Sequence, residues 1–412
     1  SDMDTTVDTM EKQFPQNVSE ITEGWLTNIL VSYFDCPVIV HSIHKENAVS
    51  KGNNFVTNVT RVQLDATMGR KRQNLSLFVK TAPESQAFQM MVDSFQIFKR
   101  ECYVYRVFLP YIAQNFHNHS HPLYYYGRES GGAGVLVLED LKSRGFTMRN
   151  KKDCISLVEA RSVITTLAKL HAHGHVIRGD GRFTFEVDLV YTDTPMGREF
   201  EQNFIKSVQS IITTQLPEFE VYLGSIRKIL FPGSEVNFFY KHPNPGKFMT
   251  IIHGDAWSNN MMFRYHDNCD PEVNLVDWQM TRPNSGVMEL AYFLHSSADC
   301  TFREQHTDCL LKLYLKTYVE QIKRYIPIRE EEYTLDELNR QYEDHKGYRF
   351  LIALMFARMV HDDVVANSVD KNSESDSFLD FGSEVSDKSM LKHFKSIMLE
   401  FIDNGLLHAS GM

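Results

Sequence analysis

The stretch that decides the fold is residues 251–279, IIHGDAWSNNMMFRYHDNCDPEVNLVDWQ. Asp255 follows an apolar run, Asn260 comes five residues later, and Asp277 ends a second apolar run. A carboxylate that closes a buried strand is costly unless it is paired, so two in such places indicate a metal ion or a substrate proton. Magnesium-assisted phosphoryl transfer needs one carboxylate to orient the attacking hydroxyl, and an amide oxygen and a second carboxylate to hold the metal. The alternative, that both aspartates only cap turns, suits either one alone better than the whole set.

Length and composition describe an ordinary globular chain that can form two lobes. It has 412 residues, of which 42% are hydrophobic and 23% charged. The net charge of −10 offers no broad basic face, so we expect no nucleic-acid partner and no anionic lipid surface. No apolar run approaches the length of a membrane span. The six cysteines are scattered without a CxxC pair and no signal peptide is evident, so we expect a cytoplasmic protein with no obligate protein partner.

The N-terminal third predicts an antiparallel sheet. After an expected helix at 18–34, three alternating or apolar runs are separated by polar turns: VIVHSIHKE (38–46), NFVTNVTRVQLD (54–65) and NLSLFVKTA (74–82). Gly52, Asn53 and Asn54 lie where the first run turns into the second, a place where backbone amides can approach phosphates. Any hairpin turn favours the same residue types, so the turn alone is weak evidence for a phosphate site.

A lysine and a glutamate follow one another across the next two elements. Lys80 ends the third run, and Glu101 lies at the edge of the apolar stripe of a long helix expected at 86–108. A strand lysine followed by a helical glutamate is the ion pair that positions the α- and β-phosphates in kinases. Two solvated surface charges are the alternative, and the Asp255 and Asp277 motifs favour the ion pair.

A further apolar strand, GAGVLVLEDL (132–141), runs out into polar residues. The exposed backbone of Glu139, Asp140 and Leu141 would suit the edge of an adenine ring, although any strand followed by a loop reads the same. From Ser156 onward the pattern is helical, with helices expected at 156–172, 198–230 with a break at Pro217, 304–325, 334–365 and 388–403. The acidic, serine-rich segment 366–388 predicts a loop.

Three histidines at the end of the first of these helices, His171, His173 and His175, raise the possibility of a zinc site. His171 and His175 share a helix face, but Gly174 interrupts the run. No glutamate accompanies them as in an HExxH motif. A packed helix terminus is therefore the favoured interpretation.

Several motifs together resemble a known family. HGDAWSNN (253–260) followed by VDWQ (276–279), with FVK (78–80) upstream, is similar to the aminoglycoside and choline kinase branch of the protein-kinase-like fold. KGNNF (51–55), FVKTAP (78–83), FKRECYVYRVFLP (98–110), LVLEDL (136–141) and HGDAWSNNMMF (253–263) narrow the resemblance to the ecdysteroid kinase-like family of arthropods. The resemblance implies an α+β, bilobal protein-kinase-like fold. Its parts would be a small antiparallel-sheet N-terminal lobe with one long helix (1–138), a hinge (139–142) and a larger, mostly helical C-terminal lobe (143–412).

The resemblance also implies a role for each motif residue. Asp255 would be the catalytic base, Asn260 and Asp277 the Mg²⁺ ligands, and Lys80 the phosphate-binding lysine with Glu101 as its partner. The nucleotide would further contact Gly52, Asn53, Asn54, Glu139, Asp140 and Leu141, and His253 would brace the catalytic loop. Two departures stand out, a phosphate loop with the single glycine Gly52 and Glu289 where the broader group usually has aspartate.

The implied activity is an ATP- and Mg²⁺-dependent kinase that phosphorylates a hydroxyl of a small molecule, an ecdysteroid or another lipophilic alcohol. A choline- or aminoglycoside-type polar acceptor is one alternative, and a catalytically inactive kinase-like binding protein is another. The presence of all five catalytic, metal and ion-pair positions argues against the inactive protein. Gly254, where protein kinases have arginine, and the lack of an APE element after Asp277 argue against a protein kinase.

Overall fold

The computed structural model describes residues 14–48, 57–83, 86–116, 121–130, 133–178, 183, 195–231, 236, 243–361 and 387–409. The chain divides into two compact units, one formed by residues 1–147 and 277–280, the other by residues 148–276 and 281–412. The predicted phosphate turn with Gly52, Asn53 and Asn54 lies outside the described residues, as does the segment 366–386.

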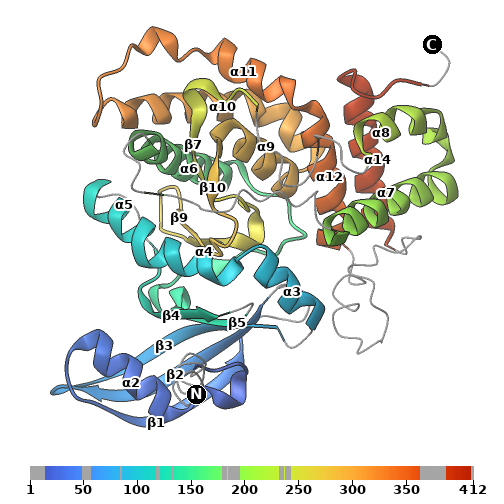
Figure 1. Cartoon of the computed structure of the whole chain (residues 1–412). Helices are drawn as coiled ribbons and strands as arrows, with labels where there is room; N and C mark the ends of the chain where they lie inside the picture. The colour runs from blue at the N-terminus through green and yellow to red at the C-terminus, as the bar shows by residue number, and fades with distance from the viewer. Residues whose placement is uncertain are drawn as a thin grey trace, which may run out of the picture. The chain divides into compact units, whose positions relative to one another are not determined.

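The first unit is built on a five-stranded antiparallel sheet in the order β1-β2-β3-β5-β4 (Figure 1). The strands are β1 (Val38–Asn47), β2 (Asn58–Met68), β3 (Lys71–Thr81), β4 (Tyr124–Ser130) and β5 (Ala133–Glu139). The turn η1 (Val18–Glu20) precedes helix α2 (Glu23–Phe34), which begins where Thr22 accepts a hydrogen bond from the Trp25 amide. Leu26 and Leu30 of α2 pack on Val62, Leu77 and Val137 of the sheet to form the core of this unit.

The helix expected at 86–108 is present but divided. Gln96 has a left-handed backbone (φ 50°) and separates α3 (Gln86–Ser94) from α4 (Ile97–Tyr103). A π-helical turn, η2 (Val104–Phe108), and helix α5 (Leu109–Phe116) continue the chain beyond the expected end. Periodicity could not show this division, because apolar residues recur on both sides of Gln96.

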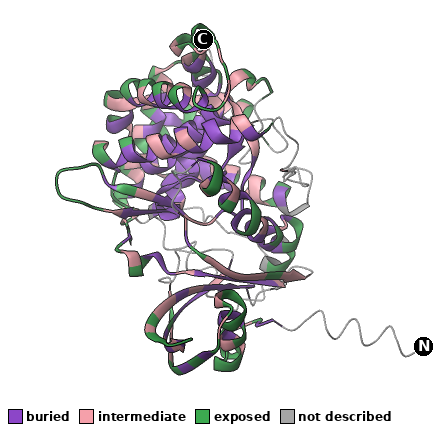
Figure 2. Ribbon diagram, turned by 90° about the vertical axis from the view of Figure 1, so that its left-hand side faces the viewer, coloured by how far each residue is buried: buried purple, intermediate pink, exposed green. Residues whose placement is uncertain are grey.

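The second unit is mostly helical, as predicted, and its buried residues lie where the helices pack against one another (Figure 2). Its helices are α6 (Leu157–Ile177), α7 (Pro195–Gln215), α8 (Leu223–Ile229), α9 (Gly286–Ser297), α10 (Cys300–Ile322), α11 (Leu335–Asp344), α12 (Lys346–His361) and α14 (Lys388–Asp403). The short turns are η6 (Pro217–Tyr222), η7 (Gly246–Phe248), η8 (Ser258–Asn260) and η9 (Glu330–Glu332). The break at Pro217 and the start of α11 after the Thr334 cap confirm the sequence interpretation.

Short strand pairs carry the motif segment of this unit. β7 (Met249–Ile252) pairs antiparallel with β10 (Arg282–Ser285), and β8 (Met261–Arg264) pairs antiparallel with β9 (Glu272–Leu275). β6 (Thr147–Met148) stands beside β8 in the strand order. The antiparallel sheet of the first unit and the helical second unit confirm the predicted α+β kinase-like class.

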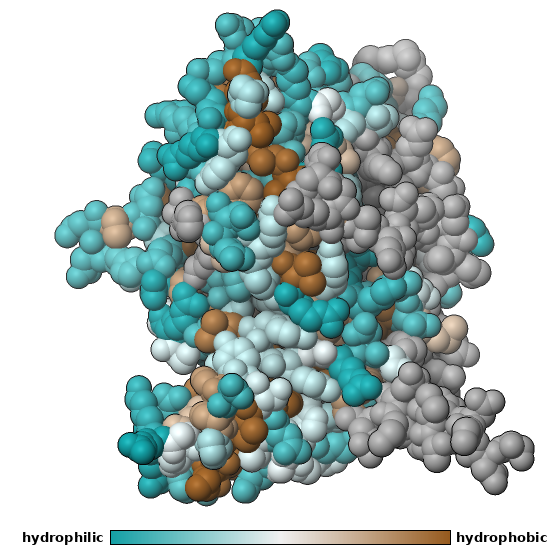
Figure 3. All heavy atoms as spheres, turned by 60° about the vertical axis from the view of Figure 1, so that its left-hand side comes forward, coloured by the Kyte–Doolittle hydropathy of each residue, from teal (hydrophilic) through white to brown (hydrophobic). Residues whose placement is uncertain are grey.

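Large hydrophobic side chains that remain exposed are spread along the chain, Ile39, Met90 and Val221 among them. The face in Figure 3 is mainly hydrophilic, with hydrophobic areas of limited size. Within the part of the chain that the structure describes, no helix is both long and apolar enough to cross a membrane.

Helix α6 begins at the predicted residue but does not stop at Gly174. Ser156 and Glu159 form a reciprocal capping box at its start, and the helix runs through Gly174 to Ile177. A Cβ on Gly174 would lie 2.4 Å from Thr250 Oγ1 and 2.7 Å from the Ile251 nitrogen. This glycine therefore serves the close approach of α6 to β7, rather than the end of the helix.

We expect Gly174→Ala to lower the free energy of unfolding by about 1–3 kcal/mol, because the added methyl meets backbone of β7 that cannot move aside. Gly24→Ala in α2 is the matched control, since nothing lies within 4 Å of its Cβ position. The control should keep or raise stability by up to about 1 kcal/mol through helix propensity. Urea denaturation of both variants measures the difference, and equal stability of the two would contradict the packing role.

Candidate active site

Asp255 lies directly beyond the buried strand β7, and two side chains hold its carboxylate. Asn260 Nδ2 donates to Asp255 Oδ2 at 2.8 Å and to the Asp255 carbonyl at 2.9 Å. Tyr292 Oη donates to Asp255 Oδ1 at 2.5 Å. Both carboxylate oxygens are thus fixed by donors that favour the ionised form. The structure brings the predicted base Asp255 and the predicted metal ligand Asn260 together.

The backbone of this segment is held by Glu289 of α9. Glu289 accepts hydrogen bonds from the amides of His253 (3.0 Å) and Gly254 (2.5 Å) and from His171 Nε2 (2.7 Å). Gly254 has φ 90°, a conformation that L side chains rarely adopt, so glycine is required where the chain turns toward Asp255. Burial alone would raise the pKa of Glu289, but the bond and charge of His171, with His253 and Gly254, outweigh it and hold the pKa below its usual value.

His253 links two parts of the same motif. Its Nε2 lies 2.9 Å from the Val276 carbonyl, which can only accept, so Nε2 carries the proton. Nδ1 then accepts from the Asp255 amide at 3.3 Å. The imidazole therefore joins the start of the catalytic segment to the residue before Asp277, a geometry that fits the expected bracing role.

Tyr292 is a functional candidate that the sequence interpretation missed. It is buried in α9, three residues after Glu289, so both side chains leave the same face of the helix. Burial and the Asp255 charge raise the pKa of Tyr292 well above its usual value, so the hydroxyl stays protonated and donates. The sequence signal for Tyr292 was its spacing of three residues from Glu289. Using that signal required the role of Glu289 in the site to be known first.

In the first unit, one ammonium group serves two carboxylates. Lys80 Nζ lies 2.8 Å and 3.1 Å from the two oxygens of Glu101 and 2.9 Å from Asp277 Oδ1. Burial lowers the pKa of Lys80, but the charges of Asp277 and Glu101 outweigh it and raise the pKa. For Glu101 burial dominates, with Asp277 adding to it, and raises the pKa to about 7. Two carboxylates thus share the single ammonium group of Lys80.

The position of these three side chains follows from their elements. β3 lies between β2 and β5, where Lys80 stands opposite Val59 and Leu136. Asp277 has a left-handed backbone with φ 66°, which is uncommon for a residue with a side chain and is found at functional sites. The predicted Lys80–Glu101 pair is present in the structure, and Asp277 joins it.

The expected hinge residues engage their side chains in the fold. The Asp140 carboxylate accepts from Arg61 Nε (2.5 Å), Ser76 Oγ (2.8 Å) and the Lys142 amide (3.2 Å). Glu139 accepts from the Leu123 amide at 3.1 Å and pairs with Arg144 at 3.4 Å. Leu141 is buried at the start of the turn η3 (Leu141–Arg144). The backbone amides of Glu139 and Asp140 are also used, since they donate to the carbonyls of Leu123 at 2.9 Å and Ser76 at 3.0 Å.

The three histidines of α6 do not converge. His171 binds Glu289 and Tyr314, His173 stacks edge-on against Tyr325, and His175 lies 3.1 Å from the Met249 carbonyl. The described residues contain no group of three or more His, Cys, Asp or Glu side chains placed to hold a metal.

The Mg²⁺ ligands expected from the sequence are of the right chemical kind. Asn260 spends its amide nitrogen on Asp255, and no described residue hydrogen-bonds its oxygen Oδ1. Asp277 offers a carboxylate, which forms an ion pair with Lys80. Oxygen donors of these two types are those that Mg²⁺ prefers.

The α+β fold and the motif residues fit the kinase-like class of small-molecule phosphotransferases. The chain belongs to the ecdysteroid kinase-like family, whose model matches residues 51–325. No curated protein matches the chain in sequence.

Solved structures with a similar fold include three small-molecule kinases. An ethanolamine kinase of Plasmodium vivax is 12% identical, with 90% of this chain and 92% of that chain covered and a TM-score of 0.44. A microcompartment-associated aminopropanol kinase is 11% identical, with 93% and 99% covered and a TM-score of 0.43. The GDP and kanamycin complex of APH(2")-IIIa is 11% identical, with 92% and 99% covered and a TM-score of 0.42. Likenesses at this level transfer no substrate to this chain.

We expect Glu289→Gln to lower the free energy of unfolding by about 3 kcal/mol near neutral pH, because it removes the charge from a buried pair. Native contacts depress the pKa of Glu289, so its contribution is complete above the unfolded-state pKa and is lost as the pH falls through the folded-state pKa. Wild type and variant should therefore converge in acid.

Urea denaturation at a series of pH values measures this convergence. Glu320→Gln is the control, since Glu320 is an exposed residue of α10. A difference between wild type and Glu289→Gln that stays constant from acid to neutral pH would contradict the assigned role.

Proposed function

We propose that this chain is an ATP- and Mg²⁺-dependent kinase that phosphorylates a hydroxyl group of an ecdysteroid or another lipophilic alcohol. The observation that carries the proposal is the Asp255 carboxylate, held through both oxygens by Asn260 and Tyr292. A carboxylate fixed in this way is positioned to accept a proton from an attacking hydroxyl. Membership of the ecdysteroid kinase-like family supports the steroid class of acceptor.

The proposed step is an in-line transfer of the γ-phosphoryl group from ATP to the acceptor hydroxyl. The acceptor oxygen forms a bond to the γ-phosphorus as the bond from that phosphorus to the bridging oxygen breaks, and ADP leaves. The hydroxyl proton passes to Asp255. A correctly placed acceptor converts this step into an effectively unimolecular one, so the orientation of Asp255 contributes directly to the rate.

The first unit supplies the charge complement for the nucleotide. Lys80, held by Glu101, presents an ammonium group suited to phosphate oxygens. Two carboxylates, Glu101 and Asp277, face the one ammonium group of Lys80, so a further cation would be favoured when both are ionised. Bound Mg²⁺ supplies charge neutralisation of the phosphates, and Asn260 and Asp277 are the residues that would hold it.

Buried aromatic side chains surround Tyr292 beside the Asp255 carboxylate. Phe356 packs edge-on against Tyr292 at 5.3 Å between ring centroids, and Trp257 lies 5.0 Å from Phe356. These aromatic side chains give the catalytic segment apolar neighbours.

ATP consumption with magnesium, across steroid, choline-like, aminoglycoside and phenolic alcohols, tests the function. We expect turnover with steroids or other lipophilic alcohols. Asp255→Asn should lower the rate by about 10²–10⁴-fold and leave ATP binding intact. Asp277→Asn should instead weaken magnesium-dependent ATP binding. Single-turnover rates of Asp255→Asn within a few-fold of wild type would rule out the catalytic base, and magnesium-dependent ATP binding without any turnover would favour an inactive binding protein.

Tyr292→Phe tests the hydrogen bond from the Tyr292 hydroxyl to the Asp255 carboxylate. It removes one hydrogen bond to a charged group, so we expect kcat to fall about tenfold with the KM values for ATP and acceptor little changed. Tyr318→Phe is the matched control, since Tyr318 is equally buried and its hydroxyl donates to the Lys247 carbonyl rather than to Asp255. An equal loss of kcat in both variants would show a general packing effect and not a role in positioning Asp255.

A further inference from the structure

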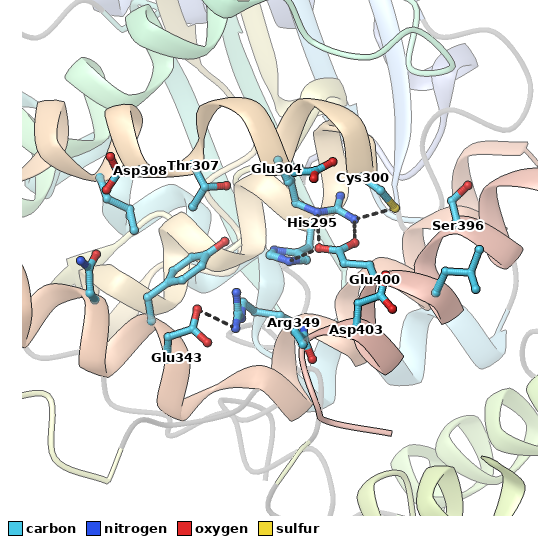
Figure 4. A pocket seen from close by; sticks show the side chains of 16 residues that line it. His295, Cys300, Glu304, Thr307, Asp308, Glu343, Arg349, Ser396, Glu400 and Asp403 are labelled. Carbon is cyan, nitrogen blue, oxygen red and sulfur yellow. Dashed lines mark hydrogen bonds and ion pairs between the residues drawn. The ribbon is translucent and has the colours of Figure 1, made fainter. Parts of the chain in front are cut away.

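A groove separate from the catalytic segment lies among the helices of the second unit. It has a volume of about 830 Å³ and is walled by the end of α9 with α10, α11, α12 and α14 (Figure 4). This volume is within the range of small-molecule sites. Neither Asp255 nor Asn260 lines it.

One wall of the groove consists of side chains whose hydrogen bonds are satisfied within the protein. Arg303 donates through Nε to Glu400 Oε1 at 3.1 Å and through Nη2 to Glu400 Oε2. Its Nη1 donates to the carbonyls of Leu294 and Ala298 at the end of α9. Arg303 and Glu400 thus join α9, α10 and α14. The nitrogens of Arg303 and both carboxylate oxygens of Glu400 already have hydrogen-bond partners within the protein.

Arg349 is different, because its buried donors are not met. Only 6% of Arg349 is exposed, yet within the described residues Nε and Nη2 make no hydrogen bond. Nη2 forms an ion pair with Glu343 Oε1 at 3.2 Å, outside hydrogen-bond geometry, and the guanidinium carbon stacks 4.3 Å from the centre of the Tyr342 ring. Buried donors left unmet cost about 1–3 kcal/mol each, so they indicate an acceptor that arrives with a ligand.

His295, in contrast, has a hydrogen-bond acceptor without a donor. Its Nδ1 lies 2.9 Å from the Ala291 carbonyl, which only accepts, so the proton is on Nδ1. Burial, with Arg303 and Arg349 nearby, lowers the pKa of His295 well below its usual value, so the ring is neutral and Nε2 is a bare acceptor. Nε2 lies 3.8 Å from Glu400 Oε1, and two acceptors cannot bond to each other. Among the described residues Nε2 has no partner, and it calls for a donor.

The unmet donors of Arg349 and the unmet acceptor of His295 both lie near the Tyr342 ring. The Tyr342 ring centre is 6.2 Å from that of His295 and 4.3 Å from the guanidinium of Arg349. Glu304 and Asp403, both exposed, also line the groove, and in the described structure neither makes an ion pair. The groove therefore offers unmet donors at Arg349, an unmet acceptor at His295, and two further carboxylates among its lining residues.

We propose that this groove binds a small zwitterion, with a carboxylate received by Arg349 and an ammonium group received by His295 and the carboxylates of Glu304 and Asp403. A free α-amino acid is the simplest molecule of this class. The arginine fork suits a planar carboxylate, and an ammonium group has the several donors that a lone imidazole nitrogen and two carboxylates can share.

Isothermal titration calorimetry of the full chain with each common L-amino acid tests the proposal. For any amino acid that binds, its N-acetyl and methyl ester forms are titrated next. We expect each blocked form to bind roughly tenfold or more weakly, because each lacks one charged partner. No binding by any amino acid, or a blocked form that binds as tightly as its parent, would overturn the proposal.

Variants place the binding in this groove. The double variant Glu304→Gln with Asp403→Asn changes exposed residues and should fold, and we expect it to bind roughly tenfold more weakly. Glu320→Gln, elsewhere on α10, should bind as wild type, and so should Asp255→Asn. Arg349→Lys keeps the charge but loses the fork, and it should also bind more weakly. Unchanged affinity in the double variant, or lost affinity in Asp255→Asn, would place the ligand elsewhere and overturn the proposal.

Discussion

The buried carboxylate of Glu289 is the constraint on which the second unit depends. It receives two consecutive backbone amides, of His253 and Gly254, and the imidazole of His171, so its charge is compensated by three donors. A carboxylate without such partners could not remain ionised at this depth. The segment before Asp255 is therefore attached to α9 through its backbone.

Helix α9 extends this attachment along its length. Tyr292 holds the Asp255 side chain, and Ser297 accepts from the Ser258 amide at 3.1 Å. Every residue of α9 is buried, so the helix is fixed by its surroundings on all faces. At its start, a Cβ on Gly286 would lie 2.4 Å from Tyr314 Oη and 2.7 Å from His171 Nδ1. The glycine allows the helix to approach the same network that compensates Glu289.

Sequence patterns predicted most helices and strands, and they predicted two pairs of interacting side chains. Asp255 with Asn260 and Lys80 with Glu101 could be expected because spacing and residue type are sufficient to suggest them. The contact of Tyr292 with Asp255 could not be read in this way, because it joins a loop to a helix face whose orientation is set by tertiary packing. The division of the long helix at Gln96 and the passage of α6 through Gly174 were also hidden, since a left-handed residue and a close backbone approach leave periodicity unchanged.

Buried polar groups in the second unit fall into two kinds that have different explanations. His171, Glu289 and Tyr314 satisfy one another, so their burial is explained by folding alone. His295 and Arg349 are as deeply buried, yet each keeps a hydrogen-bonding atom unmet beside the Tyr342 ring. Folding gains nothing from such atoms and loses their hydration, and apolar residues of similar volume would stabilise the same helices better. One acceptor and one set of donors facing a common groove are therefore better explained by a molecule that satisfies both than by the stability of the fold.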